Sequence, residues 1–523
     1  MDQMGRPSGG TITAFIWASR ALARSVSFIF KKEREMILDR IARSLVALCL
    51  GILGFVVSPF TLAASPHQMS PLIAVGPSVK PAVQGAKFGL FRCQVGIDPF
   101  GRVCYDPYQL RHAYGADAFI NSGIDGTGRT IVIIDAFQAP TLASDVGAFI
   151  SFYGLPAINL TVEAPCGQVP FTGTAAQVSW WSEITLDVES SHAMAPGANI
   201  ILVLSKTDQD SDIECALNYA VTNHLGDIIS MSFGENESCV DPVAFPKYIQ
   251  DFTAATLAGI TLFASSGDQG AVQPTCDGSS WVKSVSFPAS VPLITAVGAT
   301  ELHAAGYCLA VLGCNPATAP QPGTYEFEIA WNEGPTFGDF QSLLSSTEST
   351  GGGESIIFDQ PPWQKSTVGG KSRGVPDVAY TGAIFHGELI IWQGLTFLFG
   401  GTSVGSPGWS ALTAIAGQLN GGSLGFLSKA IYKAKRGSFN DITTGTNSSF
   451  QPFDAFGNPI TPPVTVIGFD AGPGYDFTTG VGSPITENLF PLHVPPGDAV
   501  SAVNSTKAKP NTPPYPTGQV KPH

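Results

Sequence analysis

The sequence predicts an α/β protein whose central sheet is parallel and doubly wound, with helices on both faces. Helical patterns, for example at 212–225 and 245–259, alternate with short apolar runs. The runs are rich in β-branched residues and have the length of buried parallel strands. Such alternation is typical of βαβ units, in which ligands bind beyond the carboxyl ends of the strands. The apolar runs span 130–137, 198–205, 227–233, 260–267 and 293–300.

The composition supports one large folded domain. Of 523 residues, 44% are hydrophobic and 13% are charged. This suffices for a large core and is too apolar for a disordered chain. We expect the domain to run from about residue 105 to 492. The Pro-rich segment 493–523 is expected to be disordered.

The N-terminal region has the pattern of a signal peptide. Arg40 and Arg43 precede an uncharged run at 45–57, which is too short to span a bilayer comfortably, and small residues follow it. We interpret 36–64 as a signal peptide and treat 1–35 as a mis-annotated extension. We therefore expect a secreted or extracytoplasmic protein with no stable membrane span after cleavage.

Eight cysteines lie beyond the proposed signal peptide, and an even number in an exported chain suggests disulfides. Cys93–Cys104 and Cys308–Cys314 are plausible local pairs, although sequence alone does not fix the connectivity. The chain has no CxxC pair of the kind that binds zinc. The other four cysteines are Cys166, Cys215, Cys239 and Cys276.

The net charge argues against a nucleic-acid partner. The chain has 27 basic and 41 acidic side chains, and residues 1–64 hold 8 and 4 of these, so the remainder has 19 and 37 and a net charge of −18. Nucleic-acid binding requires basic patches, which such a chain is poorly equipped to form.

The stretch LFGGTSVGSPGW (398–409) suggests a serine held at the entry of a helix. Gly400 and Gly401 allow backbone conformations and close approaches that a side chain would forbid. Ser403 then precedes a helix whose first turn tolerates Pro407. Two readings stay open on this motif alone: a nucleophile at a helix N-terminus, or an ordinary Ser/Thr N-cap.

Two carboxylates in WWSEITLDVESSHAMAPGANI (180–200) have helical spacing. Glu183 and Asp187 are four residues apart, so a helix places them on one face. A solvated acidic face is the commoner structure, but the apolar flanks, Trp180 and Trp181 among them, favour a buried helix. Two buried carboxylates would share a proton, which suits a base that works in acid.

A third carboxylate follows a predicted strand. Asp268 lies in FASSGDQGA (263–271), directly after the apolar run at 260–267. It is either a turn residue or a group that points towards the strand ends. Kept protonated at low pH, an aspartic acid can donate a hydrogen bond to a developing oxyanion.

These motifs together resemble the sedolisin, or serine-carboxyl peptidase, family. The resemblance covers about residues 105–485. It implies a subtilisin-like fold and hydrolysis of peptide bonds at acidic pH, by an endopeptidase or a tripeptidyl-peptidase acting on proteins or peptides. The stretches that carry it are GGTSVGSPGW, EITLD, HAMAPGA, SSGDQG, DGTGRTIVIIDAF, FPASVPLITAVGAT, GGGESIIFDQPPWQ and RGVPDVAY.

The resemblance also implies roles for individual residues. By motif, Ser403 is similar to the nucleophile and Glu183 to its general base. Asp187 would orient and tune Glu183, and Asp268 would serve the oxyanion hole.

A calcium site is implied near the C-terminus, where DITTG (441–445) and DAGPGYDFTTGVGSP (470–484) resemble the family's site. Calcium prefers hard oxygen ligands, and glycines let carbonyls turn inward. Without the resemblance we would interpret the segment as a Gly-rich turn. The ligands of one structural ion would be the carboxylates of Asp441 and Asp476 and the carbonyls of Ile442, Gly472 and Gly474.

One departure from the family concerns the prosegment. Family members are commonly made with a large folded prosegment, whereas here the short lead segment 65–104 separates the predicted cleavage site from the domain. A separately encoded prosegment and a constitutively active form are two alternatives.

Two rival functions stay open. The first is a subtilisin-type triad composed of Asp135, His192 and Ser403. The flanks of His192 lack the HGTH context of such a histidine, however, and we interpret His192 as structural. The second alternative is a secreted binding protein on an inactive peptidase scaffold. Against it, all four positions that resemble catalytic residues retain suitable chemistry. We expect a monomer.

Overall fold

The computed structural model describes residues 67–80, 90–333, 348–435, 437–490, 492, 494–495, 497–506 and 508–509. All of them belong to one compact unit, Leu62–His523. The predicted extension 1–35 and signal peptide 36–64 lie outside the described residues. Within the described part of the chain, no helix has the length and apolar character that a membrane crossing requires.

The central sheet has the predicted parallel architecture. All five apolar runs form its strands, and the neighbouring pairs from β5 to β13 are parallel. β17 also pairs with β13 in parallel, and β14 pairs with it antiparallel. In sheet order the strands are β5 (Asn159–Glu163), β6 (Asn199–Ser205), β4 (Thr130–Ala136), β7 (Ile228–Met231), β9 (Thr261–Ser265), β13 (Thr295–Ala304) and β14 (Tyr325–Ala330), with β17 (Val378–Thr381) beside β13.

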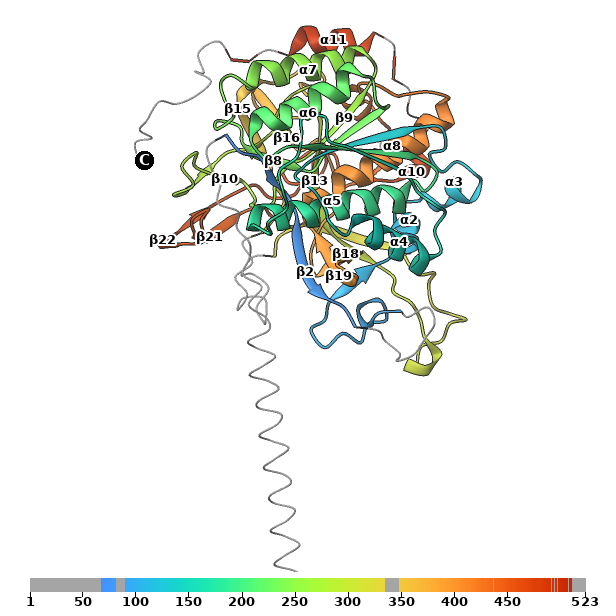
Figure 1. Cartoon of the computed structure of the whole chain (residues 1–523). Coiled ribbons are helices and arrows are strands. Elements are labelled where there is room, and N and C mark those ends of the chain that lie inside the picture. The colour runs from blue at the N-terminus through green and yellow to red at the C-terminus, as the bar shows by residue number, and fades with distance from the viewer. Residues whose placement is uncertain are drawn as a thin grey trace, which may run out of the picture. The chain divides into compact units, whose positions relative to one another are not determined.

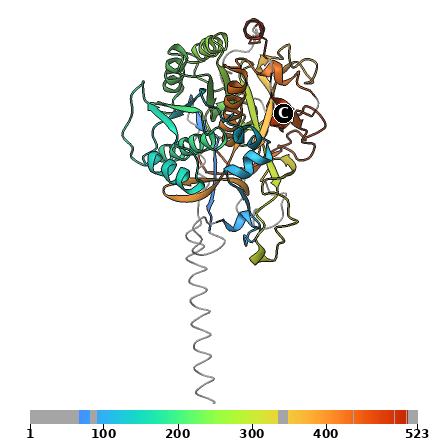
Figure 2. The same cartoon turned by 90° about the vertical axis from the view of Figure 1, so that its right-hand side faces the viewer.

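Helices cover both faces of this sheet because alternate residues of each strand face opposite ways. In β4, Ile131 and Ile133 pack in one core with α5 and α8, whereas Val132 and Ile134 pack in a second core with α6 and α7. Figures 1 and 2 show α6 and α7 on one side of the sheet and α5 on the other. The bounds are α5 (Ala175–Met194), α6 (Asp210–Thr222), α7 (Phe245–Leu257) and α8 (Gly405–Asn420).

A smaller sheet leads the chain to the predicted nucleophile. Its order is β2-β19-β18-β3, and β19 ends at Gly400, directly before the turn that holds Ser403. β2 belongs to the lead segment, which also forms the short strand β1 beside β8. The bounds are β1 (Ser70–Pro71), β2 (Ala74–Ser78), β3 (Val103–Tyr105), β8 (Phe233–Asn236), β18 (His386–Trp392) and β19 (Leu395–Gly400).

The remaining elements surround these two sheets. The helices are α2 (Pro107–Ala113), α3 (Asp117–Asn121), α4 (Leu142–Tyr153), α9 (Ser428–Ile431) and α10 (Thr486–Leu489), with 3-10 turns η1 (Arg92–Gln94) and η2 (Ala310–Leu312). The strands are β10 (Val272–Pro274), β11 (Trp281–Lys283), β12 (Ser286–Phe287), β15 (Gly353–Asp359), β16 (Ser372–Val375), β20 (Phe439–Asn440), β21 (Ser449–Phe453), β22 (Pro459–Val466) and β23 (Ser483–Pro484).

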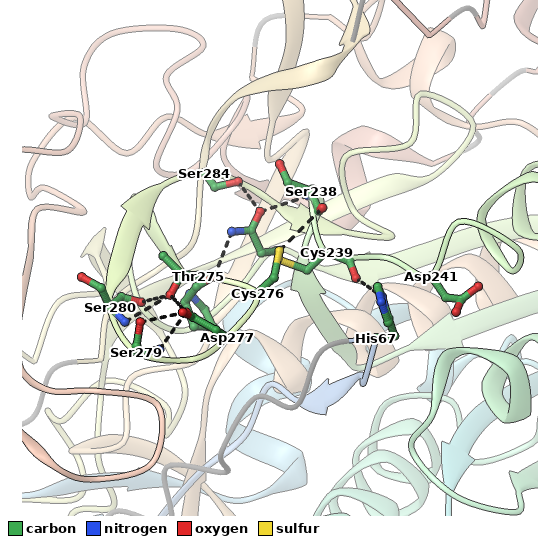
Figure 3. Close-up of a disulfide and its surroundings, with 12 residues drawn as sticks. His67, Ser238, Cys239, Asp241, Thr275, Cys276, Asp277, Ser279, Ser280 and Ser284 are labelled. Atoms are coloured by element: carbon green, nitrogen blue, oxygen red, sulfur yellow. Dashed lines mark hydrogen bonds between the residues drawn. A yellow bond between two sulfur atoms is a disulfide. The ribbon is translucent and has the colours of Figure 1, made fainter. Parts of the chain in front are cut away.

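All eight cysteines beyond the signal region form disulfides. Cys93–Cys104 and Cys308–Cys314 confirm the two local pairs. Cys166–Cys215 and Cys239–Cys276 complete the set. Figure 3 shows that the Cys239–Cys276 bridge lies beside His67, whose Nδ1 is 2.7 Å from the Cys239 carbonyl. Four bridges fit an oxidising compartment, as expected for an exported chain.

The expectation of a disordered tail is wrong for one segment. Asp498–Ser505 forms α11, which packs beside α7 (Figure 1). Ala502 is buried in the core on that side, and the Asp498 carboxylate pairs with Lys429. This stretch contains no proline, and the Pro-rich composition of the tail as a whole concealed a short amphipathic helix. Residues 510–523 lie outside the described part.

Candidate active site

Ser403 lies in a tight turn between β19 and α8. Gly401 has φ +96°, and a Cβ there would stand 2.5 Å from the Leu72 carbonyl oxygen and 2.6 Å from Asp268 Oδ2, so glycine is required. The 3-10 turn Thr402–Val404 follows, with no side-chain cap at α8. The N-cap alternative is therefore wrong. The Ser403 hydroxyl instead donates to Glu183 Oε2 at 2.9 Å.

Glu183 and Asp187 lie one turn apart on α5, and both are fully buried. The alternative of a solvated acidic face is therefore wrong. Asp187 Oδ1 accepts a hydrogen bond from Ser232 Oγ at 2.8 Å, and the Ser232 carbonyl oxygen is 3.2 Å from Ser403 Oγ. Ser232, which sequence reasoning missed, follows β7 and ties the carboxylate helix to the serine turn.

Burial and mutual repulsion set the protonation of these carboxyls. Burial raises the pKa of Glu183 well above its usual range, and the charges of Asp187 and Asp135 raise it further. Burial also raises the pKa of Asp187 to about 8, against hydrogen bonds with Ser232 and Glu183 that lower it. Because the charge of Asp187 raises the pKa of Glu183, the two carboxyls titrate as a unit.

Asp135 belongs to this carboxyl cluster and not to a histidine triad. It lies in β4 and is fully buried, and among the described residues neither of its carboxyl oxygens has a hydrogen-bond partner. Burial raises its pKa well above the usual range, and the charge of Asp187 adds to the effect. The sequence singled out Asp135 only as part of the rival triad, so its place beside Asp187 was missed.

His192 is remote from the serine. It lies nine residues beyond Glu183 on the same helix, about 13 Å along the axis. Its Nε2 is 2.9 Å from the Pro156 carbonyl oxygen, and burial lowers its pKa. The structure therefore does not assemble Asp135, His192 and Ser403, and His192 joins α5 to the chain before β5.

Asp268 lies on the other side of the serine turn. Its Oδ1 accepts hydrogen bonds from the Thr402 amide at 2.8 Å and the Thr402 hydroxyl at 2.7 Å. Its Oδ2 has no partner among the described residues and lies near Gly401. Burial raises the pKa of Asp268 well above its usual range, against the Thr402 hydrogen bonds. In acid, Oδ2 is therefore placed to carry a proton that it can donate.

The lead segment lies directly over the serine, which sequence reasoning did not foresee. β1 runs antiparallel to β8, and the Leu72 amide donates to the Ser232 carbonyl at 3.1 Å. The Ser403 amide in turn donates to the Leu72 carbonyl oxygen at 2.9 Å. A Cβ on Gly401 would lie close to both this oxygen and Asp268 Oδ2. The Leu72 carbonyl is thus held by the amide of the predicted nucleophile, on the side of Gly401 where Asp268 lies.

The residues implied for calcium converge on one loop. Both carboxylate oxygens of Asp441 accept from the Gly474 amide at 3.0 Å, and Asp476 Oδ2 accepts from the Gly472 amide at 3.0 Å. Gly474 has φ +83°, in the left-handed region, and Ile442 is buried beside Asp441. Two carboxylates gathered by one glycine-rich loop form a donor set that fits a hard cation.

Fold and site together define a class of protein: a subtilisin-like α/β scaffold in which a buried serine is hydrogen-bonded to a carboxyl instead of a histidine. Residues 172–435 match the subtilase family. The chain belongs to this family, and within it to the sedolisins.

Known proteins support that assignment. Kumamolisin of Bacillus sp. (strain MN-32) is 30% identical over 407 residues, which cover 75% of this chain and 64% of that protein. Sedolisin of Pseudomonas sp. (strain 101) is 29% identical over 384 residues, 67% of this chain and 58% of that protein. Tripeptidyl-peptidase 1 of Canis lupus familiaris is 25% identical over 374 residues, 65% of this chain and 56% of that protein. The chain thus spans less than two thirds of the length of each.

A solved structure is also similar. Pseudomonas sedolisin, a serine-carboxyl proteinase complexed with two molecules of pseudo-iodotyrostatin, aligns with a TM-score of 0.58 and 26% identity. The alignment covers 74% of this chain and 97% of that chain. The predicted fold class is thereby confirmed.

Proposed function

We propose that this protein is a secreted serine-carboxyl peptidase that hydrolyses peptide bonds in acid. The observation that carries the proposal is the 2.9 Å hydrogen bond from Ser403 Oγ to Glu183 Oε2, next to a peptide carbonyl held by the Ser403 amide. The four disulfides support export. The alternative of a binding protein is tested by the same assays, since an inert wild type would favour it.

The residues have distinct roles in this reaction. Ser403 Oγ bonds to the substrate carbonyl carbon while its proton passes to the ionised Oε2 of Glu183, and the carbonyl electrons move onto oxygen. The one proton that the two carboxyls share lies on Asp187 at this point. The Ser403 amide and protonated Asp268 donate to that oxyanion. Glu183 then gives its proton to the leaving amine, an acyl-enzyme remains, and water repeats the sequence to release the acid. Asp187, held by Ser232, keeps Glu183 in place and shares its proton.

The pH dependence of activity is expected to report Asp268. Because burial raises its pKa, Asp268 is a neutral donor in acid, and as pH rises it ionises and places a negative charge beside the oxyanion. Asp268→Asn keeps an N–H donor that does not titrate, so the alkaline limb of kcat/KM should move to higher pH or vanish. Asp268→Ala should lower kcat by roughly 100- to 1000-fold.

This profile is measured from pH 3 to 8 on a denatured protein substrate. Asp277→Asn, at an exposed aspartate in a turn, is the matched control and should leave the profile unchanged. An unaltered alkaline limb in Asp268→Asn would remove Asp268 from the oxyanion hole.

The path of the lead segment favours an endopeptidase over a tripeptidyl-peptidase. The Leu72–Ile73 bond takes the place of the scissile bond, because the Ser403 amide holds the Leu72 carbonyl. A tripeptidyl-peptidase must end its binding site three residues before the scissile bond, which here is Ser70. The chain continues past that position: the Met69 amide donates to the Asp208 carbonyl at 2.9 Å, and the Asp210 amide donates to the His67 carbonyl at 3.1 Å. Substrate chain should therefore extend upstream without obstruction.

Mass spectrometry of the products of a denatured protein tests this choice. We expect internal fragments of varied length from the earliest times, also from a substrate whose N-terminus is acetylated. Release of tripeptides alone, blocked by acetylation, would contradict endopeptidase action.

We also propose one structural calcium ion at Asp441 and Asp476, with the carbonyls of Ile442, Gly472 and Gly474. These carboxylates and carbonyls would supply the hard oxygen ligands that calcium prefers. With Ca²⁺ at about 100 times its Kd, chelation should lower the free energy of unfolding by about 3 kcal/mol.

Thermal unfolding with Ca²⁺ and with a chelator measures the effect. Asp441→Asn should unfold at the same temperature in both conditions. Asp454→Asn, at a half-buried loop aspartate that also accepts backbone amides, should respond as the wild type does. A wild-type melting temperature that ignores chelation would remove calcium from the proposal.

A further inference from the structure

A second set of metal-ligating side chains lies apart from the serine and from the proposed calcium loop. Glu301 and His303 are two residues apart on β13, so they lie on the same face of that strand. His386 begins β18, in the smaller sheet. One ligating atom from each of the three lies within 4.8 Å of the others.

The distances within this Glu301–His303–His386 cluster suit a small cation. His303 Nε2 is 2.9 Å and His386 Nδ1 is 3.2 Å from the same oxygen, Glu301 Oε1. Ligands that bind tetrahedral Zn²⁺ at about 2.0–2.1 Å stand roughly 3.3 Å from one another. The three atoms therefore need only small adjustments to share one ion.

The His386 contact is not an ordinary hydrogen bond. Its Nδ1 is buried and forms no hydrogen bond within the described part of the chain, although Glu301 Oε1 is 3.2 Å away. A buried ring nitrogen that is close to a carboxylate oxygen but misaligned with it is better satisfied by an ion that both can ligate.

The rings are held in place before any ion binds. The His303 ring stacks on Phe327 of β14, with centroids 4.1 Å apart and planes 13° apart, and the His303 and His386 centroids are 4.5 Å apart. The side chains of Glu301 and His386 are 12% and 15% exposed, and that of His303 is 28% exposed. One side of the cluster therefore opens to solvent, where water can complete the coordination.

We propose that Glu301, His303 and His386 bind a divalent transition-metal ion, Zn²⁺ by preference. Two imidazoles and one carboxylate select such an ion over Ca²⁺, which prefers oxygen ligands alone. The ion would join β13 of the central sheet to β18 of the smaller sheet. Because β18 pairs with β19, which leads to Gly400 and the serine turn, the ion would hold together the two sheets that position Ser403.

Isothermal titration of the metal-free protein with ZnCl2 at pH 7.0, in the presence of excess Ca²⁺, tests the proposal. The Ser403→Ala background excludes self-digestion and makes the result independent of peptidase activity. We expect one Zn²⁺ per chain, with affinity at least about tenfold weaker in His303→Ala and in Glu301→Gln, because each removes one ligand. His112→Ala is the matched control, since His112 pairs with Asp117 at 2.8 Å but is outside the cluster.

A spectroscopic measurement distinguishes loss of the site from loss of the fold. Bound Co²⁺ in the unaltered cluster should give the visible absorption of a four- or five-coordinate ion, and Zn²⁺ should displace it. Circular dichroism then shows whether the variants are folded. Absence of Zn²⁺ binding in the parent protein, or equal binding in the folded His303→Ala variant, would overturn the proposal.

Discussion

The wild-type protein is expected to cut its own chain between Leu72 and Ile73 in acid, whereas Ser403→Ala should stay whole. The Leu72 carbonyl oxygen already accepts a hydrogen bond from the Ser403 amide at 2.9 Å, and the Leu72 amide donates one to the Ser232 carbonyl oxygen. The scissile bond is thus positioned before the reaction begins, which removes the cost of bringing the two groups together.

N-terminal sequencing and intact mass after transfer from pH 8 to pH 4 measure this cleavage. Because the bond belongs to the same molecule, its rate should not change on tenfold dilution. Ser406→Ala alters another buried serine, in the first turn of α8, and should cut normally. A new N-terminus other than Ile73, or the same cut in Ser403→Ala, would contradict the arrangement.

Glu183→Gln is expected to lower kcat by roughly 10⁴-fold or more, because the amide cannot accept the Ser403 proton. The variant should nevertheless fold. Glu183 has a raised pKa in the folded protein, so the folded state holds its proton more tightly than the unfolded state does. The carboxyl of the unfolded state ionises above about pH 4. The wild type therefore loses stability as the pH rises from there towards the pKa of Glu183 in the folded state.

Removal of that titrating group should make Glu183→Gln lose less stability than the wild type between pH 4 and pH 8. Asp187→Asn should behave likewise, since the pKa of Asp187 rises to about 8 on folding. Urea unfolding at several pH values measures both effects. A Glu183→Gln protein that is inactive because it is unfolded would fail this test. A folded variant whose stability depends on pH as strongly as that of the wild type would contradict a buried pair that shares one proton.

Much of the fold could be predicted because apolar β-branched runs report parallel strands directly. The run at 130–137 became β4, and the helical spacing of Glu183 and Asp187 placed both on one buried face of α5. The motif around Gly401 likewise located the serine turn. These features are encoded within a few neighbouring residues.

The rest of the site depends on contacts between distant parts of the chain. Ser232 and Asp135 approach the carboxylate helix only through the order of strands in the sheet, and no spacing in the sequence reports that order. Leu72 reaches Ser403 from 331 positions away in the chain, within a segment whose sequence resembles an ordinary linker. Asp498–Ser505 was missed because composition averages over a whole tail.

The most direct test of the central claim compares kcat/KM of the wild type, Glu183→Gln and His192→Ala on a denatured protein from pH 3 to 8. If a carboxyl is the base, Glu183→Gln loses acid activity by roughly 10⁴-fold while His192→Ala keeps most of it. If Glu183→Gln retains full activity and His192→Ala loses it, the base is the histidine and the carboxyl mechanism is wrong.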